Sequence, residues 1–349
     1  MPYSKSKYIV ANEHRIYGYT ESMPDSLRDV VVNWVKKRHG WDVKREWLHY
    51  TPGVVSGLCT SVLALTEPGD GIMLQPPVYP PFYNVIKENG RRIVANPLKL
   101  VDGRCKMDFD DMTHKMKTGV RMMILCSPHN PVGRVWTHDE LVQLAKLCLE
   151  YDVILVSDEI HSDIVFSSHK HIPAASVLQE MERKTVTCIA ASKTFGVAGL
   201  STSVTIIPDP EFRISFENKL DGMGIKFGNI FGIAATEAAY RYGEEWLEQL
   251  LDYLEGNLQL LKEYFETKIP QIKICIPEGT YLVWMDCRQL GMNSRELSLF
   301  MTERAKVGLN DGASFGLEGD GFMRINIACP RAILQEGLKR IECAVKYAK

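Results

Sequence analysis

Three strand-like stretches of this 349-residue chain each end beside a polar residue of a different chemical kind. The stretch RMMILC runs into the loop SPHNPVG, which contains Asn130, and the stretch VILVS ends at Asp158. The third stretch, TVTCI, breaks into small residues around Lys193. In a parallel sheet, groups just beyond the carboxyl ends of strands lie where ligands bind. The pattern therefore predicts an amide, a carboxylate and an amine in one site.

The order of elements around these residues predicts a parallel α/β sheet. A capping box, T-H-D-E at 137–140, opens a helix between the first two stretches. Apolar side chains then recur at i, i+3, i+4 and i+7, as a helix with one buried face requires: Leu141, Leu144, Ala145 and Cys148. Strand, helix and strand form a βαβ unit, and several such units in series favour a mostly parallel sheet.

A second, smaller α+β domain is predicted from the last third of the chain. A long charged pattern from about Tyr240 to Lys268 predicts a helix that leaves the first domain. The stretches TYLVWMD and FMRINI then alternate as half-buried strands do, and Ala332 to Tyr347 predicts a closing helix. We expect an amino-terminal segment 1–15, a large α/β domain 16–253 and a small domain 254–349.

Composition excludes several classes of partner and compartment. Lys plus Arg number 41 and Asp plus Glu 43, so a net charge of −2 gives no electrostatic case for binding nucleic acid or an anionic membrane. Nine scattered cysteines, none in C-x-x-C spacing, favour reduced thiols and no metal site. No apolar run has the roughly 20 residues of a spanning helix, and the start lacks the apolar stretch of a signal peptide. We expect a cytoplasmic protein.

The lysine, the aspartate and the asparagine are the groups that pyridoxal phosphate (PLP) chemistry requires. The lysine forms an imine with the cofactor, the aspartate keeps the pyridine nitrogen protonated and the asparagine donates to the ring oxygen. Small and apolar neighbours would strip water from Lys193, which suits a reactive amine rather than a surface charge. A capping role for Asp158 and a turn-forming role for Asn130 are the structural alternatives.

The motifs S-K-T-F-G-x-x-G-L, D-E-x-x and S-P-H-N-P-V-G resemble those of the fold-type I aminotransferase family. Three further stretches look more like its cystathionine β-lyase (C–S β-lyase) branch: E-G-T-Y-L-V-W-M-D, N-D-G-A-S-F-G and G-F-M-R-I-N-I-A-C-P-R. The resemblance covers nearly the whole chain from Ile16 onward. It implies the PLP-dependent transferase fold type I, with a large three-layer α/β domain and a smaller α+β domain, and PLP as cofactor.

The resemblance also implies roles around the cofactor ring. Tyr79, in the Pro-rich stretch QPPVYPPF, would stack on the ring and take part in catalysis. His161 occupies the place where many relatives carry a tyrosine near the ring oxygen, although a purely structural histidine remains an alternative. Ser192 would contact the cofactor beside Lys193.

Phosphate and substrate contacts are implied in the same way. Gly53 opens a helix whose free N–H groups at Val54 and Val55 would bind the cofactor phosphate. Tyr19 would reach the phosphate of a neighbouring subunit. Arg324, inside a predicted strand and on the same face as Asn326, would hold the substrate's α-carboxylate through its guanidinium fork.

Three departures from the family pattern stand out. The chain begins almost at the Y-G-Y-T motif, without the longer amino-terminal segment usual in relatives. Ala190 stands where a phosphate-binding serine is usual, and Ser201 stands where many aminotransferases carry a phosphate-binding arginine. The second change is typical of the lyase branch, whereas the first weakens the grip on phosphate.

The sequence thus favours a homodimeric PLP enzyme with shared active sites. Its expected reaction is the α,β-elimination of cystathionine or a related cysteine S-conjugate to a thiol, pyruvate and ammonia. An aminotransferase is the alternative enzyme, and a fold-retaining regulatory protein with weak activity is the alternative of a different class.

Overall fold

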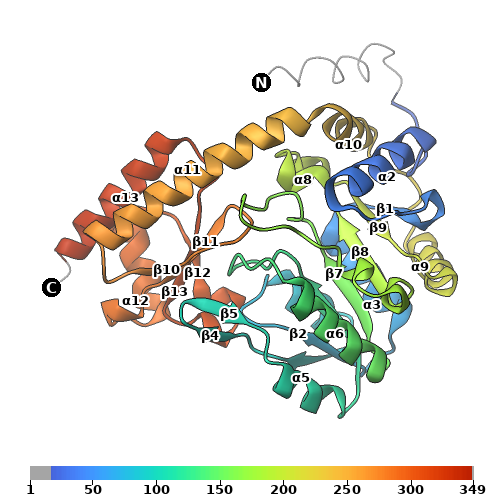
Figure 1. Ribbon diagram of the computed structural model, residues 1–349, viewed down its shortest axis with the longest axis horizontal. Coiled ribbons are helices and arrows are strands. Elements are labelled where there is room, and N and C mark those ends of the chain that lie inside the picture. Colours follow the sequence, from blue (N-terminus) through green and yellow to red (C-terminus); the bar gives the residue numbers. More distant parts are fainter. Residues whose placement is uncertain (1–16, 348–349) are drawn as a thin grey trace.

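The computed structural model describes residues 17–347. It places them in two connected units of sheet and helices, a larger system and a smaller one (Figure 1). The predicted amino-terminal segment 1–15 lies outside the described residues. The larger system is built on a seven-stranded sheet with strand order β1-β9-β8-β7-β6-β2-β3. In that order its strands are β1 (Leu48–Thr51), β9 (Ser203–Ile206), β8 (Thr185–Ile189), β7 (Ile154–Asp158), β6 (Val120–Cys126), β2 (Gly71–Leu74) and β3 (Arg92–Ala95).

Only β9 runs against its neighbours, since β8 and β1 both pair with it in antiparallel register while β8, β7, β6, β2 and β3 pair in parallel. The predicted mostly parallel sheet is therefore confirmed. The predicted strands at 121–126, 153–157 and 185–189 are β6, β7 and β8, which lie side by side in the middle of the sheet.

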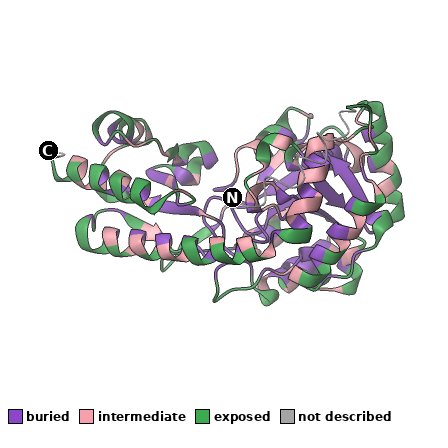
Figure 2. Cartoon of the chain, turned by 90° about the horizontal axis from the view of Figure 1, so that it is seen from above, coloured by how far each residue is buried: buried purple, intermediate pink, exposed green. Residues whose placement is uncertain are grey.

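Both faces of the sheet are covered, because the strand side chains alternate between two apolar cores. Met122 and Ile124 face one core with helices α3 (Val54–Leu65), α4 (Pro81–Lys87) and α9 (Pro210–Gly222). Met123 and Leu125 face the other core, to which three helices contribute: α5 (Phe109–Met116), α6 (His138–Glu150) and α7 (Gln179–Glu182). Such near-continuous apolar strands are typical of a parallel sheet buried on both sides. Figure 2 shows these strands buried among half-exposed helices.

Helix α6 follows the sequence closely. Thr137 and Glu140 form the predicted capping box, each side chain bonding the backbone N–H of the other. The four apolar positions of its predicted face are all buried: Leu141, Leu144, Ala145 and Cys148.

The second half of the chain begins with a break that the sequence pattern did not reveal. Two helices, α10 (Ile230–Tyr242) and α11 (Glu244–Lys268), stand where one helix from Tyr240 was expected, so that start was wrong. A Cβ at Gly243, between them, would come within 2.4 Å of the Phe195 ring. The glycine lets this ring pack on the backbone where the two helices meet.

The smaller system is an antiparallel sheet covered by helices, as predicted. Its strand order is β10-β11-β13-β12, with β10 (Lys273–Cys275), β11 (Leu282–Asp286), β13 (Phe322–Asn326) and β12 (Asn310–Asp311). Helix α11 reaches it from the large domain and packs on α13 (Arg331–Lys346), beside the shorter α12 (Ser294–Leu299) (Figure 1). The expected boundary between residues 253 and 254 falls inside α11 and stays a prediction.

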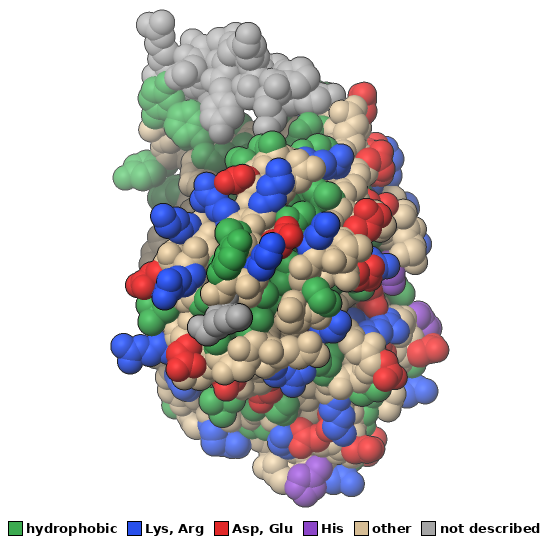
Figure 3. Space-filling model, turned by 90° about the vertical axis from the view of Figure 1, so that its left-hand side faces the viewer, with side chains coloured by type: hydrophobic (Ala, Val, Ile, Leu, Met, Phe, Trp, Pro, Cys, Tyr) green, Lys and Arg blue, Asp and Glu red, His purple; other side chains and the backbone are tan. Residues whose placement is uncertain are grey.

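The surface charges and the cysteines can be compared with what the composition predicts. On the face of the small domain that points away from the large one, basic and acidic side chains are interspersed (Figure 3). All nine cysteines are free, and six of them are buried. No helix in residues 17–347 is both long and apolar enough to cross a membrane.

Candidate functional site

Lys193 lies in the single turn of helix that follows β8. Helix α8 (Ala191–Thr194) begins after Ala190, whose extended backbone continues the strand and whose methyl group offers no side-chain cap. Because the strand ends at Ile189, the turn presents Lys193 at the carboxyl edge of the sheet, next to the end of β7. The lysine is half-buried.

Asp158 ends β7, the neighbouring strand, and is 4% exposed. One carboxylate oxygen, Oδ1, accepts a hydrogen bond of 3.1 Å from the Ile160 N–H. Burial raises the pKa of Asp158 to about 7, although the Ile160 bond and the charge of Lys193 both lower it. Within residues 17–347, no Lys, Arg or His lies within ion-pairing distance of this carboxyl. Asp158 is therefore a buried acid without a cationic partner in the described chain.

Asn130 and Arg324 come from different domains and bond directly to each other. The Arg324 Nη1 donates to Asn130 Oδ1 at 2.7 Å, and its Nη2 donates to Asn310 Oδ1 at 2.8 Å. The guanidinium carbon also lies 4.7 Å from the centre of the Phe315 ring. The Arg324 Nε is buried without a hydrogen-bond partner among the described residues. A guanidinium held in this way retains an unused donor.

Tyr79 and His161 both lie close enough to Arg324 for its charge to act on them. Burial raises the pKa of the Tyr79 hydroxyl, and the nearby charge of Asp158 raises it further, whereas the charge of Arg324 acts in the opposite direction. Burial, with the cations Lys193 and Arg324, lowers the pKa of His161 to about 3, so this imidazole is neutral at pH 7. Its Nδ1 is buried without a partner in the described part of the chain.

The loop that carries Tyr79 is fixed by both domains. His129, from the Asn130 loop, contacts the Pro77 carbonyl through Nε2 at 2.9 Å. The Val78 N–H donates to the carbonyl oxygen of Phe315 in the small domain, also at 2.9 Å. The tyrosine is thereby presented from a backbone anchored on each side.

Helix α3 begins with backbone N–H groups that have no partner within the helix. Gly53 is its N-cap and has a positive φ of 101°, which favours glycine. No side chain caps the helix. The first turn bonds from Ser56 and Gly57 to the Gly53 carbonyl, which leaves the N–H groups of Val54 and Val55 without a partner in the helix. These amides can hold an anion.

Three predicted residues are not joined to this group by hydrogen bonds. Ser192 is half-buried beside Lys193. Asn326 is exposed, and its side chain accepts a bond of 2.7 Å from the Ala328 N–H. Tyr19 is 89% exposed and stacks on Phe227 at a ring distance of 4.6 Å.

The two departures from the family pattern lie at the ends of the Lys193 segment. Ala190 is buried in the apolar core under α3, and Ser201 has a left-handed backbone with φ of 45°. Neither side chain provides a cation that could hold a phosphate.

Several residues near the site were not singled out from the sequence. Asn310 and Phe315 both hold the Arg324 guanidinium, and Tyr281 packs edge-on against His161 at 5.6 Å. All three lie in the stretches EGTYLVWMD and NDGASFG, which carried the family resemblance. Their positions within those motifs were the available indication.

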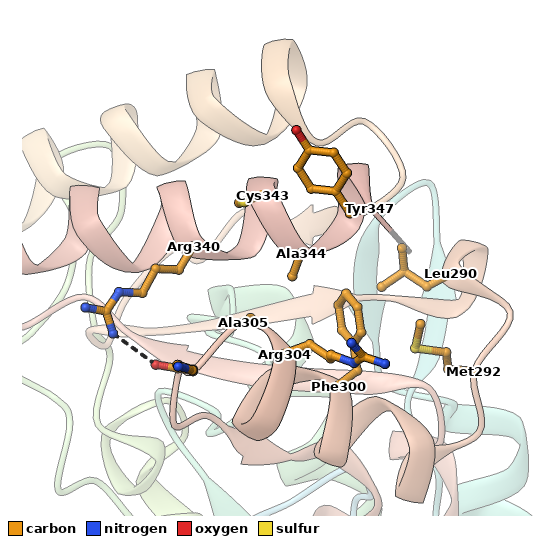
Figure 4. Close-up of a pocket in the computed structure, with 10 residues that line it drawn as sticks. Leu290, Met292, Phe300, Arg304, Ala305, Arg340, Cys343, Ala344 and Tyr347 are labelled. Atoms are coloured by element: carbon orange, nitrogen blue, oxygen red, sulfur yellow. Dashed lines mark hydrogen bonds between the residues drawn. The ribbon is translucent and has the colours of Figure 1, made fainter. Parts of the chain in front are cut away.

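A separate cavity of about 840 Å³ lies within the small domain (Figure 4). Phe300 and Met292 line it from one side and α13 from the other, where Arg340 turns away to donate to the Lys306 carbonyl. None of the predicted site residues borders it, so it is not part of the candidate site. Residues 17–347 contain no group of three or more His, Cys, Asp or Glu that could hold a metal ion.

Comparison with known proteins identifies the family. The model of the aminotransferase class I and II family matches residues 7–341. Cystathionine beta-lyase PatB of Bacillus subtilis is 44% identical over 335 residues, which is 95% of this chain and 86% of that protein.

Solved structures agree in fold. Cystalysin from Treponema denticola, which contains a pyridoxal 5'-phosphate cofactor, superposes with a TM-score of 0.97 at 35% identity, covering 100% of this chain and 89% of that one. The PLP-bound C-S lyase from Staphylococcus hominis gives a TM-score of 0.91 at 33% identity, covering 96% and 86%. The predicted fold type I architecture is confirmed, and the chain belongs to the aminotransferase class I and II family.

Proposed function

We propose that this protein is a PLP-dependent C–S β-lyase that converts cystathionine or a related L-cysteine S-conjugate into a thiol, pyruvate and ammonia. The observation that carries the proposal is the buried carboxyl of Asp158, which lies near Lys193. In the described chain, this carboxyl forms no ion pair. The likeness to cystathionine beta-lyase PatB and to the C-S lyase of Staphylococcus hominis favours this reaction over amino transfer.

In this proposal, groups of this chain would hold PLP from one end to the other. A protonated pyridine nitrogen would give the Asp158 carboxylate its missing partner. Tyr79 would cover the ring, Asn130 and His161 would face its oxygen, and Ser192 would lie beside it. The free amides of Val54 and Val55 after Gly53 would take the phosphate. Lys193 would supply the amine that bonds to the cofactor.

When bound, PLP supplies an electron sink for the bond that breaks at the substrate's Cα. The residues of this chain then hold the substrate and move its proton. Arg324 would bind the α-carboxylate through its guanidinium, with Asn326 on the same strand. Lys193 Nζ would remove the α-proton, after which the thiolate leaves from Cβ. Neutral His161 carries a single N–H, which would donate to the ring oxygen without adding positive charge to the site.

We further propose a homodimer in which Tyr19 of each chain serves the phosphate of its partner. In one chain this tyrosine is almost fully exposed, and an exposed aromatic patch marks an interaction surface: Tyr17, Tyr19 and Phe227. The nine free thiols support a cytoplasmic protein.

The test is to incubate the protein with L-cystathionine and PLP without any 2-oxo acid. A lyase releases pyruvate, ammonia and a thiol in equal amounts, whereas an aminotransferase stalls without an acceptor. A regulatory protein with weak activity would release only small amounts of all three products. Lys193→Ala should abolish both the absorbance of the lysine-bound cofactor and pyruvate release. Borohydride labelling on a lysine other than Lys193 would overturn the assignment of the amine.

A further inference from the structure

A buried carboxylate outside the candidate site is bonded to the residue that follows Lys193. Asp163, on the segment after β7, is 4% exposed. Its Oδ2 accepts a hydrogen bond of 2.8 Å from the hydroxyl of Thr194, which is 1% exposed. Thr194 is the last residue of α8, so the bond reaches the backbone turn that carries the lysine.

The other carboxylate oxygen is held by helix α2 (Asp25–His39). The indole Nε1 of Trp34 donates to Asp163 Oδ1 at 3.0 Å, and His39 Nε2 lies 3.0 Å from the same oxygen. Burial alone would raise the pKa of Asp163, but the bonds from His39, Thr194 and Trp34 outweigh it and lower that pKa. The acid is therefore ionised at neutral pH and fixed on both oxygens.

Helix α8 depends on this anchor because it has little structure of its own. It is a single turn of four residues, and isolated turns are unstable. Ala190 gives no side-chain cap before it, and Gly196 follows with φ of 67°. Within residues 17–347, the Thr194–Asp163 bond is the only side-chain hydrogen bond that α8 forms.

Trp34 holds the turn from a second direction. Its ring packs edge-on against Phe195, the residue after Thr194, at 5.9 Å, and stacks on Tyr240 at 5.0 Å. One tryptophan therefore orients the carboxylate through its N–H and supports the neighbouring backbone through its ring.

From these contacts we infer that Asp163, clamped by Trp34 and His39, is a positioning residue that fixes Lys193 for proton transfer by holding Thr194. The inference rests on the proposed role of Lys193. Asp163 itself touches no substrate or cofactor in this scheme. A displacement of about 1 Å in a reacting group can cost on the order of 100-fold in rate. Loss of the bond should therefore lower kcat about 10- to 100-fold and leave KM within about twofold.

The substitution Thr194→Val removes the hydroxyl and keeps the shape of the side chain. Thr194→Ser, which keeps the hydroxyl, should restore most of kcat. If the valine variant does not fold, Thr194→Ala against Thr194→Ser gives the same comparison. Thr185→Val is the matched control, because Thr185 is also fully buried and donates to the Met181 carbonyl at 2.7 Å from the other end of β8. The control should keep the parent's kcat.

A second readout needs no bound cofactor. In the cofactor-free protein, an amine-reactive reagent labels Lys193 at a rate that reports how well the lysine is held. Peptide mass spectrometry measures this rate. Lys184, on the Thr185 side of β8, is the internal reference. We expect Thr194→Val to raise the labelling of Lys193 relative to Lys184 at least threefold, and Thr194→Ser to leave it near the parent's value.

The outcomes separate the two proposals. Parent-like labelling and a kcat within twofold in Thr194→Val would overturn the positioning role while leaving the lyase assignment intact. A parent protein that takes up no PLP on Lys193 would overturn the proposed function, and the labelling ratios would still show whether Asp163 fixes the lysine.

Discussion

The protonation state of Asp158 is expected to differ between the cofactor-free and the cofactor-bound protein. Without a partner, its burial favours the neutral acid, and its pKa rises to about 7. With a protonated ring nitrogen beside it, the ionised form would be favoured instead. The residue thus gives a prediction about stability as well as one about rate.

For stability, we compare the cofactor-free parent with Asp158→Asn between pH 4 and 8. An aspartate in the unfolded chain titrates near pH 4, whereas the folded group titrates at about 7, so the folded state binds the extra proton in that window. The free energy of unfolding of the parent minus that of the variant should therefore fall as pH rises from about 4 to about 7, by on the order of 3–4 kcal/mol. Above pH 7 the difference should be flat.

Urea unfolding at each pH measures this difference. Asp139→Asn is the control: the Asp139 side chain is fully exposed and its ion pair with His138 is also at the surface, so no comparable fall is expected. An Asp158 curve parallel to the Asp139 curve would show that the buried acid is not protonated.

With PLP bound, Asp158→Asn should lower kcat on the order of 10³-fold, because a neutral amide cannot keep the ring nitrogen protonated.

At the level of elements, the position of α3 depends on a close approach to the sheet. A Cβ on Gly57 would meet three side chains of the underlying strands at 2.8 to 3.3 Å, those of Thr205, Thr51 and Cys188. The helix can therefore lie against β1, β8 and β9 only where this residue has no side chain. The same helix presents the amides proposed to hold phosphate.

We predict that Gly57→Ala lowers the free energy of unfolding by about 1–3 kcal/mol, as overpacking in a core does, and weakens PLP binding by displacing the start of α3. Gly222→Ala is the control, because Gly222 ends α9 with nothing within 4 Å of the added Cβ. It should be neutral or stabilise by up to about 1 kcal/mol. Thermal melting and PLP titration of both variants decide this, and equal behaviour would mean that α3 can shift without cost.

The elements also show what the sequence could and could not predict. Strands β6, β7 and β8 and helix α6 follow local patterns of apolar residues and caps, and their ends place Asn130, Asp158 and Lys193 at one edge. The Arg324–Asn130 bond joins residues 194 positions apart, and no local pattern encodes it. The break at Gly243 likewise depends on a distant ring, that of Phe195.

The tie between Asp163 and Thr194 was missed for a related reason. Thr194 was part of the lysine motif and Asp163 followed the D-E-x-x motif, but each reads as an ordinary polar residue in its own segment. Their bond becomes visible only when β7 and β8 are set side by side and α2 is placed against them.

At the scale of the whole molecule, the proposed dimer can be tested by mixing two inactive chains. Lys193→Ala lacks the amine, and Tyr19→Phe lacks the hydroxyl proposed to reach the partner's phosphate. In a mixed dimer, one site carries both defects and the other neither. If chains exchange freely at equal amounts, half of the dimers are mixed, and about a quarter of the parent's activity should return.

Each variant alone sets the baseline for this experiment, and sedimentation gives the assembly state. If Tyr19 served its own subunit, each site of a mixed dimer would carry one of the two defects, and no activity would return. A monomer in solution, or a mixture no more active than its two components, would count against the shared site.

The bond between Arg324 and Asn130 has a consequence for the choice of substrate. In the structure, a neutral amide oxygen already occupies one arm of the guanidinium, so the arginine has been desolvated and oriented before any substrate arrives. A free amino-acid carboxylate replaces that neutral acceptor with a charged one and gains the stronger bond. An amino-acid ester or amide offers only another neutral oxygen and gains little. If Arg324 has its proposed role, the resting contact would favour free amino acids over amino-acid residues within peptides.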